Sequence, residues 1–375
     1  MNRQIGSLSL KRFDAFGEVS SNAFEDEVGG IVRIFNGEIS DASTSTADEE
    51  LKGREVVLKE YPERFSELAR NEVSSHRAVQ SRDVDCENIS KLLGTAPSGR
   101  MGETWLVFSA SEIYPVSYWL DVASGEKAVP TRAQGQKGWT LLNLIDPDLE
   151  LNRRKAFVIA ILRGAIKGLA GLHRSNLLHQ NLSADSIVLS SIDERARGEP
   201  KVKLRELSFC VSVSESSLRG GGTLEEIWDQ SQRASPSGGK VNIRDDHEKA
   251  LWKQAEEEGC GTFLQKKNFG IADDVKQMGL VALFVCLKSF SGPSQSQFDF
   301  PTLKRYVEVT FSGDVRDEFR DYMGADPQYA EVVEWLDEFE GWELFQAMVQ
   351  RDWKQRPTAE SCLLHPFLQQ PLKYK

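Results

Sequence analysis

The stretch Met348–Leu368, MVQRDWKQRPTAESCLLHPFL, carries most of the information on the fold of this 375-residue chain. Upstream, Asp274–Gly279 (DVKQMG) is followed by the run LVALFVCL, which is apolar on all sides and predicts a fully buried helix. Further upstream, in Leu177–Ser190 (LLHQNLSADSIVLS), an apolar pair precedes His179, and Ile187, Val188 and Leu189 follow. Together these stretches predict a mostly helical second half of the chain.

The segment Arg154–His173 predicts an amphipathic helix that runs directly into the His179 stretch. Its apolar residues repeat at helical spacing on one side, namely Phe157, Ile161, Leu162, Ala165, Ile166, Leu169 and Leu172. After the His179 stretch, Lys201–Ser208 (KVKLRELS) has the pattern of a strand. The range 212–259 is rich in Ser, Gly and Glu and predicts a solvated segment.

The first hundred residues predict strands and one helix. Alternating or β-rich patterns favour strands at Gly30–Ile39, Glu55–Glu60, Asn88–Ala96 and Thr104–Ser109. Pro62 ends the second strand, and a helix begins near Glu63, with a face made of Phe65, Leu68, Ala69, Glu72, Val73, His76 and Val79. The polar residues 40–53 between the first two strands predict a solvated loop.

These patterns, in this order, resemble the eukaryotic protein kinase family over residues 12 to 370. Met348–Leu368 is similar to the end of the kinase C-lobe, and nine of its positions fall in register: Asp352, Arg356, Pro357, Thr358, Ala359, Leu364, His365, Pro366 and Phe367. Asp274–Gly279 resembles the start of the central C-lobe helix. The resemblance implies an α+β, bilobal protein kinase-like fold, with a small β-rich N-lobe at 12–112 and a mostly helical C-lobe at 113–370.

The resemblance also implies insertions near 40–53, 122–140 and 212–259, the last as an enlarged activation segment. In the family, the Asp at position 274 bonds the backbone of the catalytic loop. Arg356 would pair with the Glu of an A-P-E motif, which this sequence lacks. Ser235, before Pro236, is a candidate phosphorylation site in the last insertion.

The nucleotide site that the resemblance implies begins with Lys59 and Glu72, thirteen residues apart. In kinases such a Lys holds the phosphates and such a Glu orients it. Glu67 is an alternative partner on a less favourable helix face. Phe108 would lie at the back of the adenine site, and Ser109 to Ser111 would form the hinge.

The residues of phosphotransfer itself are replaced. The pattern H-R-D-L-x-x-x-N reads here as His179, Gln180, Asn181, Leu182 and Ser186. Asn181 carries no charge and is no useful base near pH 7, although Asp185 offers a displaced carboxylate. The metal-binding D-F-G triplet reads Glu206-Leu207-Ser208, which leaves Glu206 and Ser186 as poor candidate ligands for Mg²⁺.

The glycine loop that covers the phosphates in kinases has no counterpart before Gly30. In the stretch FGEVSSNAFEDEVGG, residues 16–30, Gly17, Gly29 and Gly30 occur without the spacing G-x-G-x-x-G, and Glu25, Asp26 and Glu27 are three successive carboxylates. Such a run would repel ATP rather than cradle it. We therefore expect weak or no binding of ATP and Mg²⁺.

Composition narrows the classes of partner. A net charge of −11 argues against nucleic acid or an acidic membrane as the main partner. The five cysteines show no CxxC spacing, which favours a reducing, intracellular compartment. The longest apolar run is too short to span a bilayer, and no secretory signal opens the sequence. The family includes degenerate members in plant plastids, so chloroplast and cytoplasm both stay open.

The leading hypothesis is a pseudokinase, a kinase-like module that binds or scaffolds other proteins. A divergent active Ser/Thr kinase is the first alternative, with Lys59 and Glu72 on the phosphates and Glu206 on magnesium. The second is a switch that binds ATP without transferring phosphate. A protein partner is expected in the leading case, and the oligomeric state stays open.

Overall fold

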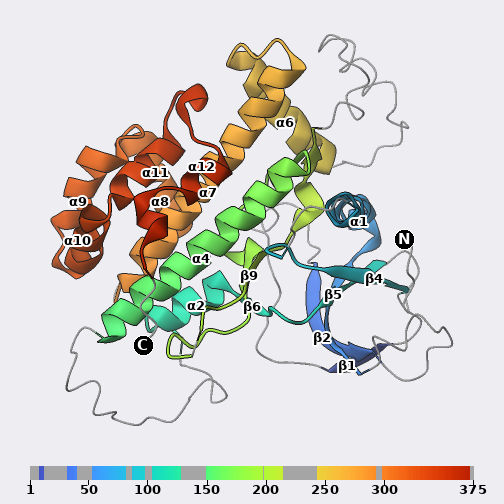
Figure 1. Ribbon diagram of the computed structural model, residues 1–375. Coiled ribbons are helices and arrows are strands. Elements are labelled where there is room, and N and C mark those ends of the chain that lie inside the picture. The colour runs from blue at the N-terminus through green and yellow to red at the C-terminus, as the bar shows by residue number, and fades with distance from the viewer. Residues whose placement is uncertain are drawn as a thin grey trace. The chain divides into compact units, whose positions relative to one another are not determined.

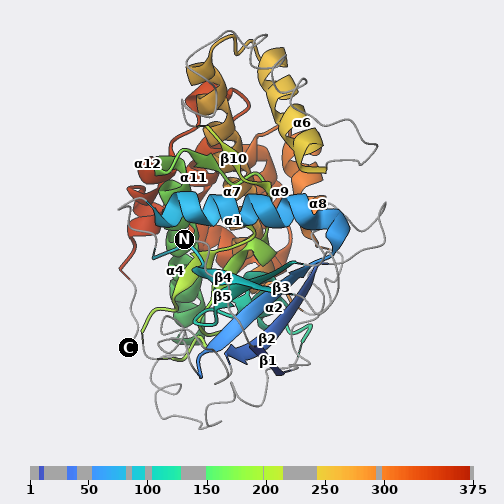
Figure 2. The ribbon, with the colours of Figure 1, turned by 90° about the vertical axis from the view of Figure 1, so that its right-hand side faces the viewer.

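The computed structural model describes residues 8–11, 32–39, 53–81, 87–97, 104–127, 149–196, 198–213, 243–292 and 298–371. These residues form helices and antiparallel sheets, so the predicted α+β class is confirmed. The chain divides into two compact units. The first consists of Met1–Ile113, Gly171–Asn181 and Arg205–Lys267, and the second of Tyr114–Ala170, Leu182–Leu204 and Asn268–Lys375. Figures 1 and 2 show the elements of both.

A five-stranded antiparallel sheet forms the centre of the first unit, in the order β1-β2-β3-β5-β4. Its strands are β1 (Leu8–Lys11), β2 (Arg33–Ile39), β3 (Glu55–Tyr61), β4 (Leu92–Pro97) and β5 (Thr104–Ser109). The predictions for β3 and β5 are confirmed almost to the residue. The prediction for β2 began at Gly30, which lies outside the described residues, and that for β4 began four residues too early, at Asn88.

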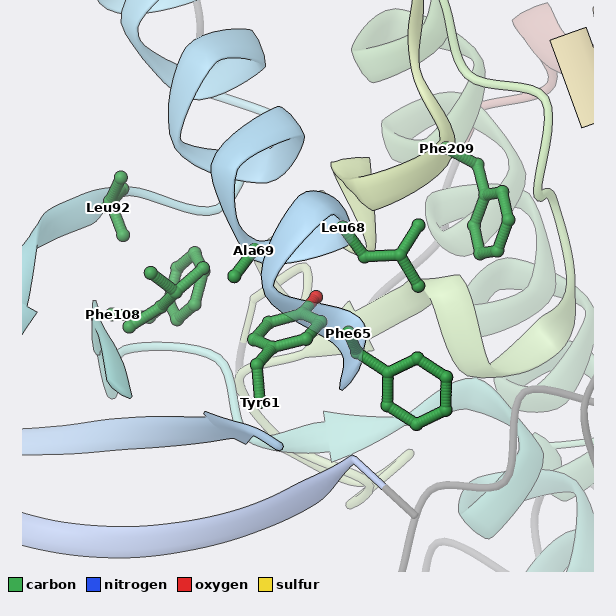
Figure 3. Close-up of a cluster of buried hydrophobic side chains, with 8 residues drawn as sticks. Tyr61, Phe65, Leu68, Ala69, Leu92, Phe108 and Phe209 are labelled. Atoms are coloured by element: carbon green, nitrogen blue, oxygen red, sulfur yellow. The ribbon is translucent and has the colours of Figure 1, made fainter. Parts of the chain in front are cut away.

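Helix α1 (Ser66–Gln80) follows β3 through Pro62 and the 3-10 turn η2 (Glu63–Phe65). Its buried face is close to the one predicted and consists of Leu68, Ala69, Glu72, Ser75, His76 and Val79. Figure 3 shows the core between this helix and the sheet, with Tyr61, Phe65, Leu68, Ala69, Leu92, Phe108 and Phe209 labelled. The opposite side of the sheet packs as a separate cluster around Val56, Leu58 and Val107.

The alternation of β3 explains which side chains meet α1. Successive residues of a strand point to opposite faces of the sheet. Val56 and Leu58 belong to the cluster away from α1, whereas Val57 and Tyr61 pack in the cluster that contains the helix residues. Lys59 therefore lies on the same face as α1, opposite Leu106 of β5 in the register.

The rest of the first unit comes from distant parts of the sequence. Strand β7 (Leu177–Leu178) pairs with β10 (Val211–Ser212), and the 3-10 turn η4 (Leu207–Phe209) lies directly before β10 in the chain. Helix α6 spans Ile243–Glu257 and buries Leu251 and Ala255. The prediction of one solvated segment over 212–259 is therefore wrong for 243–257. Ser235 lies outside the described residues.

The second unit is mostly helical, with one small sheet in the order β6-β8-β9. The strands are β6 (Tyr114–Pro115), β8 (Ile187–Leu189) and β9 (Val202–Leu204). The helices and helical turns are α2 (Val116–Ala123), α4 (Leu149–Arg174), η3 (Ala184–Ser186), α7 (Phe263–Phe290), α8 (Phe300–Arg305), η5 (Tyr306–Thr310), η6 (Val315–Phe319), α9 (Arg320–Gly324), η7 (Pro327–Tyr329), α10 (Ala330–Glu338), α11 (Gly341–Val349), η8 (Trp353–Gln355), α12 (Ala359–Leu363) and η9 (Pro366–Gln369). The last residues of α4 and the first of α7 belong to the first unit.

Helix α4 is the one helix in the described part of the chain with the length and hydropathy of a membrane span. However, 89% of its most apolar 18-residue window is buried within the protein. Such burial is typical of a core helix. The predicted amphipathic helix at Arg154–His173 is confirmed as the larger part of α4.

Helix α7 begins eleven residues earlier than predicted, so Asp274 is not at its start. Thr262 and Gln265 form a capping box: the Gln265 N–H donates to the Thr262 hydroxyl (3.3 Å), and the Thr262 N–H donates to the Gln265 side chain (3.0 Å). This cap starts the helix at Phe263. Asp274 is fully buried within the helix, and Gly279 allows close approach, since a Cβ there would lie 2.7 Å from the Cβ of Met348.

Three polar residues of the stretch Met348–Leu368 are local helix caps. Asp352 accepts from the N–H of Lys354, Thr358 from that of Ser361, and His365 from that of Phe367. The guanidinium of Arg356 donates to the carbonyls of Gln350 (2.7 Å) and Ala272 (3.1 Å). The Glu of an A-P-E motif, the partner that the family resemblance implied for Arg356, does not occur in this sequence. Backbone carbonyls accept hydrogen bonds from Arg356 instead.

Candidate functional site

The first unit buries a lysine between two glutamates. The Lys59 ammonium lies 3.0 Å from Oε2 of Glu72 and 3.3 Å from Oε2 of Glu206. Strand alternation brings Lys59 to the face that α1 covers, and the helical period brings Glu72 to the buried face of α1. All three side chains are less than a tenth exposed. The structure thus brings together three predicted site residues, which we call the ion cluster. Glu67, the alternative partner, is half-exposed and pairs with Arg70 instead.

Tyr61 belongs to the same site, although it was not predicted. Its hydroxyl donates to Oε2 of Glu72, the oxygen that also faces Lys59, and the Lys59 ammonium lies 5.0 Å from the centre of its ring. Burial, together with the charges of Glu72 and Glu206, raises the pKa of Tyr61 well above its usual value, so the hydroxyl keeps its proton. The signal was available, because Tyr61 is two residues after Lys59 on one strand face.

Glu206 is held in an unusual backbone conformation. Its φ of +69° is in the left-handed region, which costs a non-glycine residue about 1 kcal/mol or more. Ser208, at the position where the resembled family has a glycine, does not have a positive φ; it lies within η4. The Asn71 side chain of α1 donates to the carbonyls of Ser208 (2.7 Å) and Cys210 (2.9 Å), which ties this turn to the helix.

The electrostatics of Glu206 favour its charged form. Burial alone would raise the pKa of this carboxyl, but the positive charges of Lys59 and Arg205 outweigh burial and lower it. The second carboxylate oxygen, Oε1, has no hydrogen-bond partner among the described residues and lies 3.8 Å from Nε of Arg205. Taken with Lys59 and Glu72, the ion cluster has a formal charge of −1.

Two hydrogen bonds fix the ring of His179 in the stretch that follows α4. Its Nδ1 accepts from the N–H of Asn181 (3.3 Å), so Nε2 carries the proton and donates to the carbonyl of Arg205 (3.0 Å). The ring is fully buried. His179 therefore ties the backbone at Asn181 to the backbone at Arg205, next to the Glu206 turn. Asn181 itself is half-buried.

Helix α6 is anchored on this stretch by His247. The Nε2–H of His247 donates to the carbonyl of Gln180 (2.9 Å), and its ring meets that of Phe209 edge-on at 5.3 Å. Gln180 has a φ of +58°, which turns its carbonyl away from the regular strand direction. No sequence signal pointed to His247, because it lies in a polar segment without a clear apolar period.

The expected adenine-site residues lie at the end of β5. Phe108 is buried in the core below α1, where its ring meets that of His76 edge-on at 5.3 Å. The Ser109 N–H donates to the carbonyl of Lys91, and the hydroxyls of Ser109 and Ser111 lie 3.3 Å apart. The turn after β5 is thus held by its own polar groups.

His76 is a buried histidine whose ring nitrogens have no hydrogen-bond partner among the described residues. Burial, with the nearby charge of Lys59, lowers its pKa to about 3. The ring is therefore neutral at physiological pH. The sequence predicted His76 only as a member of the buried helix face.

Ser186 and Asp185 belong to the second unit. The Ser186 hydroxyl donates to the carbonyl of Ser183 (2.8 Å) and accepts from its N–H (3.0 Å), which makes it a cap of η3. Asp185 accepts a hydrogen bond from the hydroxyl of Ser117. Ser186, the candidate magnesium ligand, and Asp185, the candidate base, thus both form hydrogen bonds within the second unit.

The described residues give poor support for a magnesium site. No group of three or more His, Cys, Asp or Glu in this part of the chain is arranged to hold a metal ion. Magnesium requires oxygen ligands in near-octahedral order. In the ion cluster only Oε1 of Glu206 is not already bonded, and it faces the cation of Arg205. The residues present therefore do not fit the ion.

No protein-family model matches this chain, and no curated protein sequence matches it.

Proposed function

We propose that the chain is a protein kinase-like pseudokinase, which binds or scaffolds other proteins and has weak or no affinity for ATP. The carrying observation is the ion cluster. A lysine that is to hold phosphate must offer its positive charge, but Lys59 faces two carboxylates at 3.0 and 3.3 Å. Arg205, 3.8 Å from Glu206, brings the local formal charge to zero, so the site offers no net positive charge to attract a phosphate chain.

The stretch around Asn181 supports the same proposal. Loss of a catalytic base typically lowers the rate by a factor of about 10² to 10⁴. Asn181 cannot accept a proton near neutral pH. His179 does not replace it, because its ring nitrogens already bond the N–H of Asn181 and the carbonyl of Arg205. The proposal includes a bilobal kinase-like arrangement, for which the antiparallel sheet with α1 and the helical second unit are suitable parts.

A divergent, active Ser/Thr kinase is the second candidate, and one observation favours it. The pair of Lys59 and Glu72 is formed at 3.0 Å, as an active enzyme of the resembled family requires. In that case Glu206 would supply a carboxylate to magnesium, and Asp185 would be the nearest candidate base in the sequence.

Nucleotide binding is the first test. We expect no shift in melting temperature with millimolar ATP, with or without Mg²⁺. We also expect Glu206→Gln to gain ATP affinity, since it removes one negative charge at nearly constant shape. A shift in the wild type that Lys59→Met abolishes would favour the ATP-binding switch or the enzyme.

Transfer of labelled γ-phosphate to protein substrates is the second test. We expect no transfer above that of a Glu206→Ala control. Transfer by the wild type that the Glu206→Ala variant loses would overturn the pseudokinase proposal and establish the active-kinase alternative.

A further inference from the structure

Three aromatic side chains of the second unit gather at its surface. The ring centres of Tyr306 and Phe311 lie 6.2 Å apart, and that of Tyr322 lies 5.3 Å from each. The Tyr322 hydroxyl donates to that of Tyr306 at 3.3 Å. Tyr322 is 48% exposed, and Val309, in the same turn η5 as Tyr306, is 71% exposed. We call Tyr306, Phe311 and Tyr322 the aromatic patch. Figure 1 shows the neighbouring helices α8 and α9.

The segment that forms the patch is strongly acidic. Residues 306–340 contain eleven Asp and Glu against two Arg, a charge of −9 in a chain of net charge −11. Both arginines are already paired, Arg316 with Glu343 at 3.5 Å and Arg320 with Asp337 at 2.7 Å. The exposed carboxylates of the segment are those of Asp317, Glu318, Asp321, Glu331, Glu334, Asp337, Glu338 and Glu340.

A cation already lies on the patch. The guanidinium carbon of Arg305 is 5.7 Å from the ring centre of Tyr306. The hydrogen bond with Tyr306, burial and, to a smaller extent, the charge of Asp326 raise the pKa of Tyr322. An aromatic face beside a carboxylate suits a planar cation, since the ring and the negative charge attract it together.

We propose that the aromatic patch and the carboxylates of its segment bind an arginine-rich segment of a partner protein. The inference rests on the proposed scaffolding function and adds the chemistry of the partner. Arginine is favoured over lysine because its flat guanidinium stacks on rings and bonds carboxylates through two N–H groups at once. Nucleic acid and acidic lipid are disfavoured, because their phosphates carry the same sign of charge as the segment.

The test measures binding of a fluorescent nine-residue peptide with three arginines to the full-length chain by anisotropy at low salt. We expect saturable binding that is weaker for the matched lysine peptide and absent for the citrulline peptide. Tyr322→Ala should lower the affinity about fivefold, the equivalent of one exposed cation–π contact. Tyr322→Phe keeps the ring and should bind like the wild type.

A pair of charge variants separates a defined site from general attraction to an acidic protein. Asp317→Asn with Glu318→Gln removes two charges from the acidic segment. Glu257→Gln with Glu258→Gln removes two exposed charges at the end of α6, in the first unit. We expect the first double variant to weaken binding severalfold and the second to have little effect.

Equal loss in both double variants, or Tyr322→Ala binding like the wild type, would overturn the inference. So would a wild-type dimer that Tyr322→Ala converts to a monomer, because the patch would then bind a second copy of the chain. Failure of the peptide test leaves the absence of ATP binding and phosphotransfer intact, whereas phosphotransfer by the wild type would overturn the proposed function alone.

Discussion

His76 shows how a single buried side chain can set the pH dependence of stability. Its ring is fully buried against Phe108 and near the charge of Lys59, and its nitrogens have no hydrogen-bond partner among the described residues. A buried polar group without a partner costs free energy, because it loses its bonds to water on folding. The residue is thus tolerated in its neutral form only.

We predict that stability falls as the pH is lowered below about 6.5, in part because of His76. The pKa of the ring is about 3 in the folded chain and 6.5 when unfolded, so the unfolded state binds more protons between these values. Lowering the pH from 7 to 5 should therefore cost about 2 kcal/mol of unfolding free energy.

The variant His76→Leu should remove this contribution and leave stability at pH 7 unchanged or improved, since leucine has no polar atoms to satisfy. Urea denaturation of both proteins at pH 7 and pH 5 measures the difference. An unchanged loss of stability at pH 5 in the variant would contradict this account of the residue.

At the scale of single elements, helix α7 depends on a cap that its own sequence supplies. Thr262 and Gln265 satisfy N–H groups at the start of the helix, which would otherwise lack partners. Four residues separate the end of α6 at Glu257 from this cap. The cap therefore determines where one helix stops and the next begins.

We predict that Thr262→Ala lowers the free energy of unfolding by about 1 kcal/mol, the usual cost of losing such a cap. Thr262→Ser keeps the hydroxyl and serves as the matched control, with stability close to that of the wild type. The midpoint of chemical denaturation measures both. Equal losses in the two variants would show that the methyl group of Thr262, and not its hydroxyl, is what matters.

At the scale of the whole molecule, the first compact unit is assembled from three separate segments of the chain. Residues up to Ile113 supply the sheet, α1 and two members of the ion cluster. Glu206 comes from the third segment, as do the carbonyls of Ser208 and Cys210 that Asn71 bonds. The sheet and its helix are therefore incomplete without residues that lie far away in the sequence.

We predict that residues 1–113, produced alone, do not fold cooperatively. Without Phe209 the core between α1 and the sheet loses an aromatic side chain, and without Glu206 the buried Lys59 loses one of its two counter-charges. Circular dichroism during heating should show a broad, shallow change, in contrast to the full chain. A sharp transition in the fragment would show that the other two segments contribute little to the stability of the unit.

The parts of the structure that follow a local period could be predicted from the sequence. Helical spacing in α1 was enough to place Glu72 on the buried face of the helix, whereas its pairing with Lys59 was expected only from the family resemblance. The position of Glu206 relative to them depends on the tertiary fold, which no local pattern encodes, and the family resemblance supplied it only as an expectation. Helix α6 was missed because its segment is polar, and Asp274 was taken as a helix start because the cap at Thr262 was overlooked.

The caps at Asp352, Thr358 and His365 bear on what sequence similarity between two proteins can show. Each of these side chains serves a backbone N–H two or three residues further along, so each is required by the local path of the chain. Two proteins that share this path both need a capping side chain at these positions, whether or not either of them is a catalyst. A match in such a stretch is evidence of common architecture, and evidence of common chemistry has to come from residues that make no such cap.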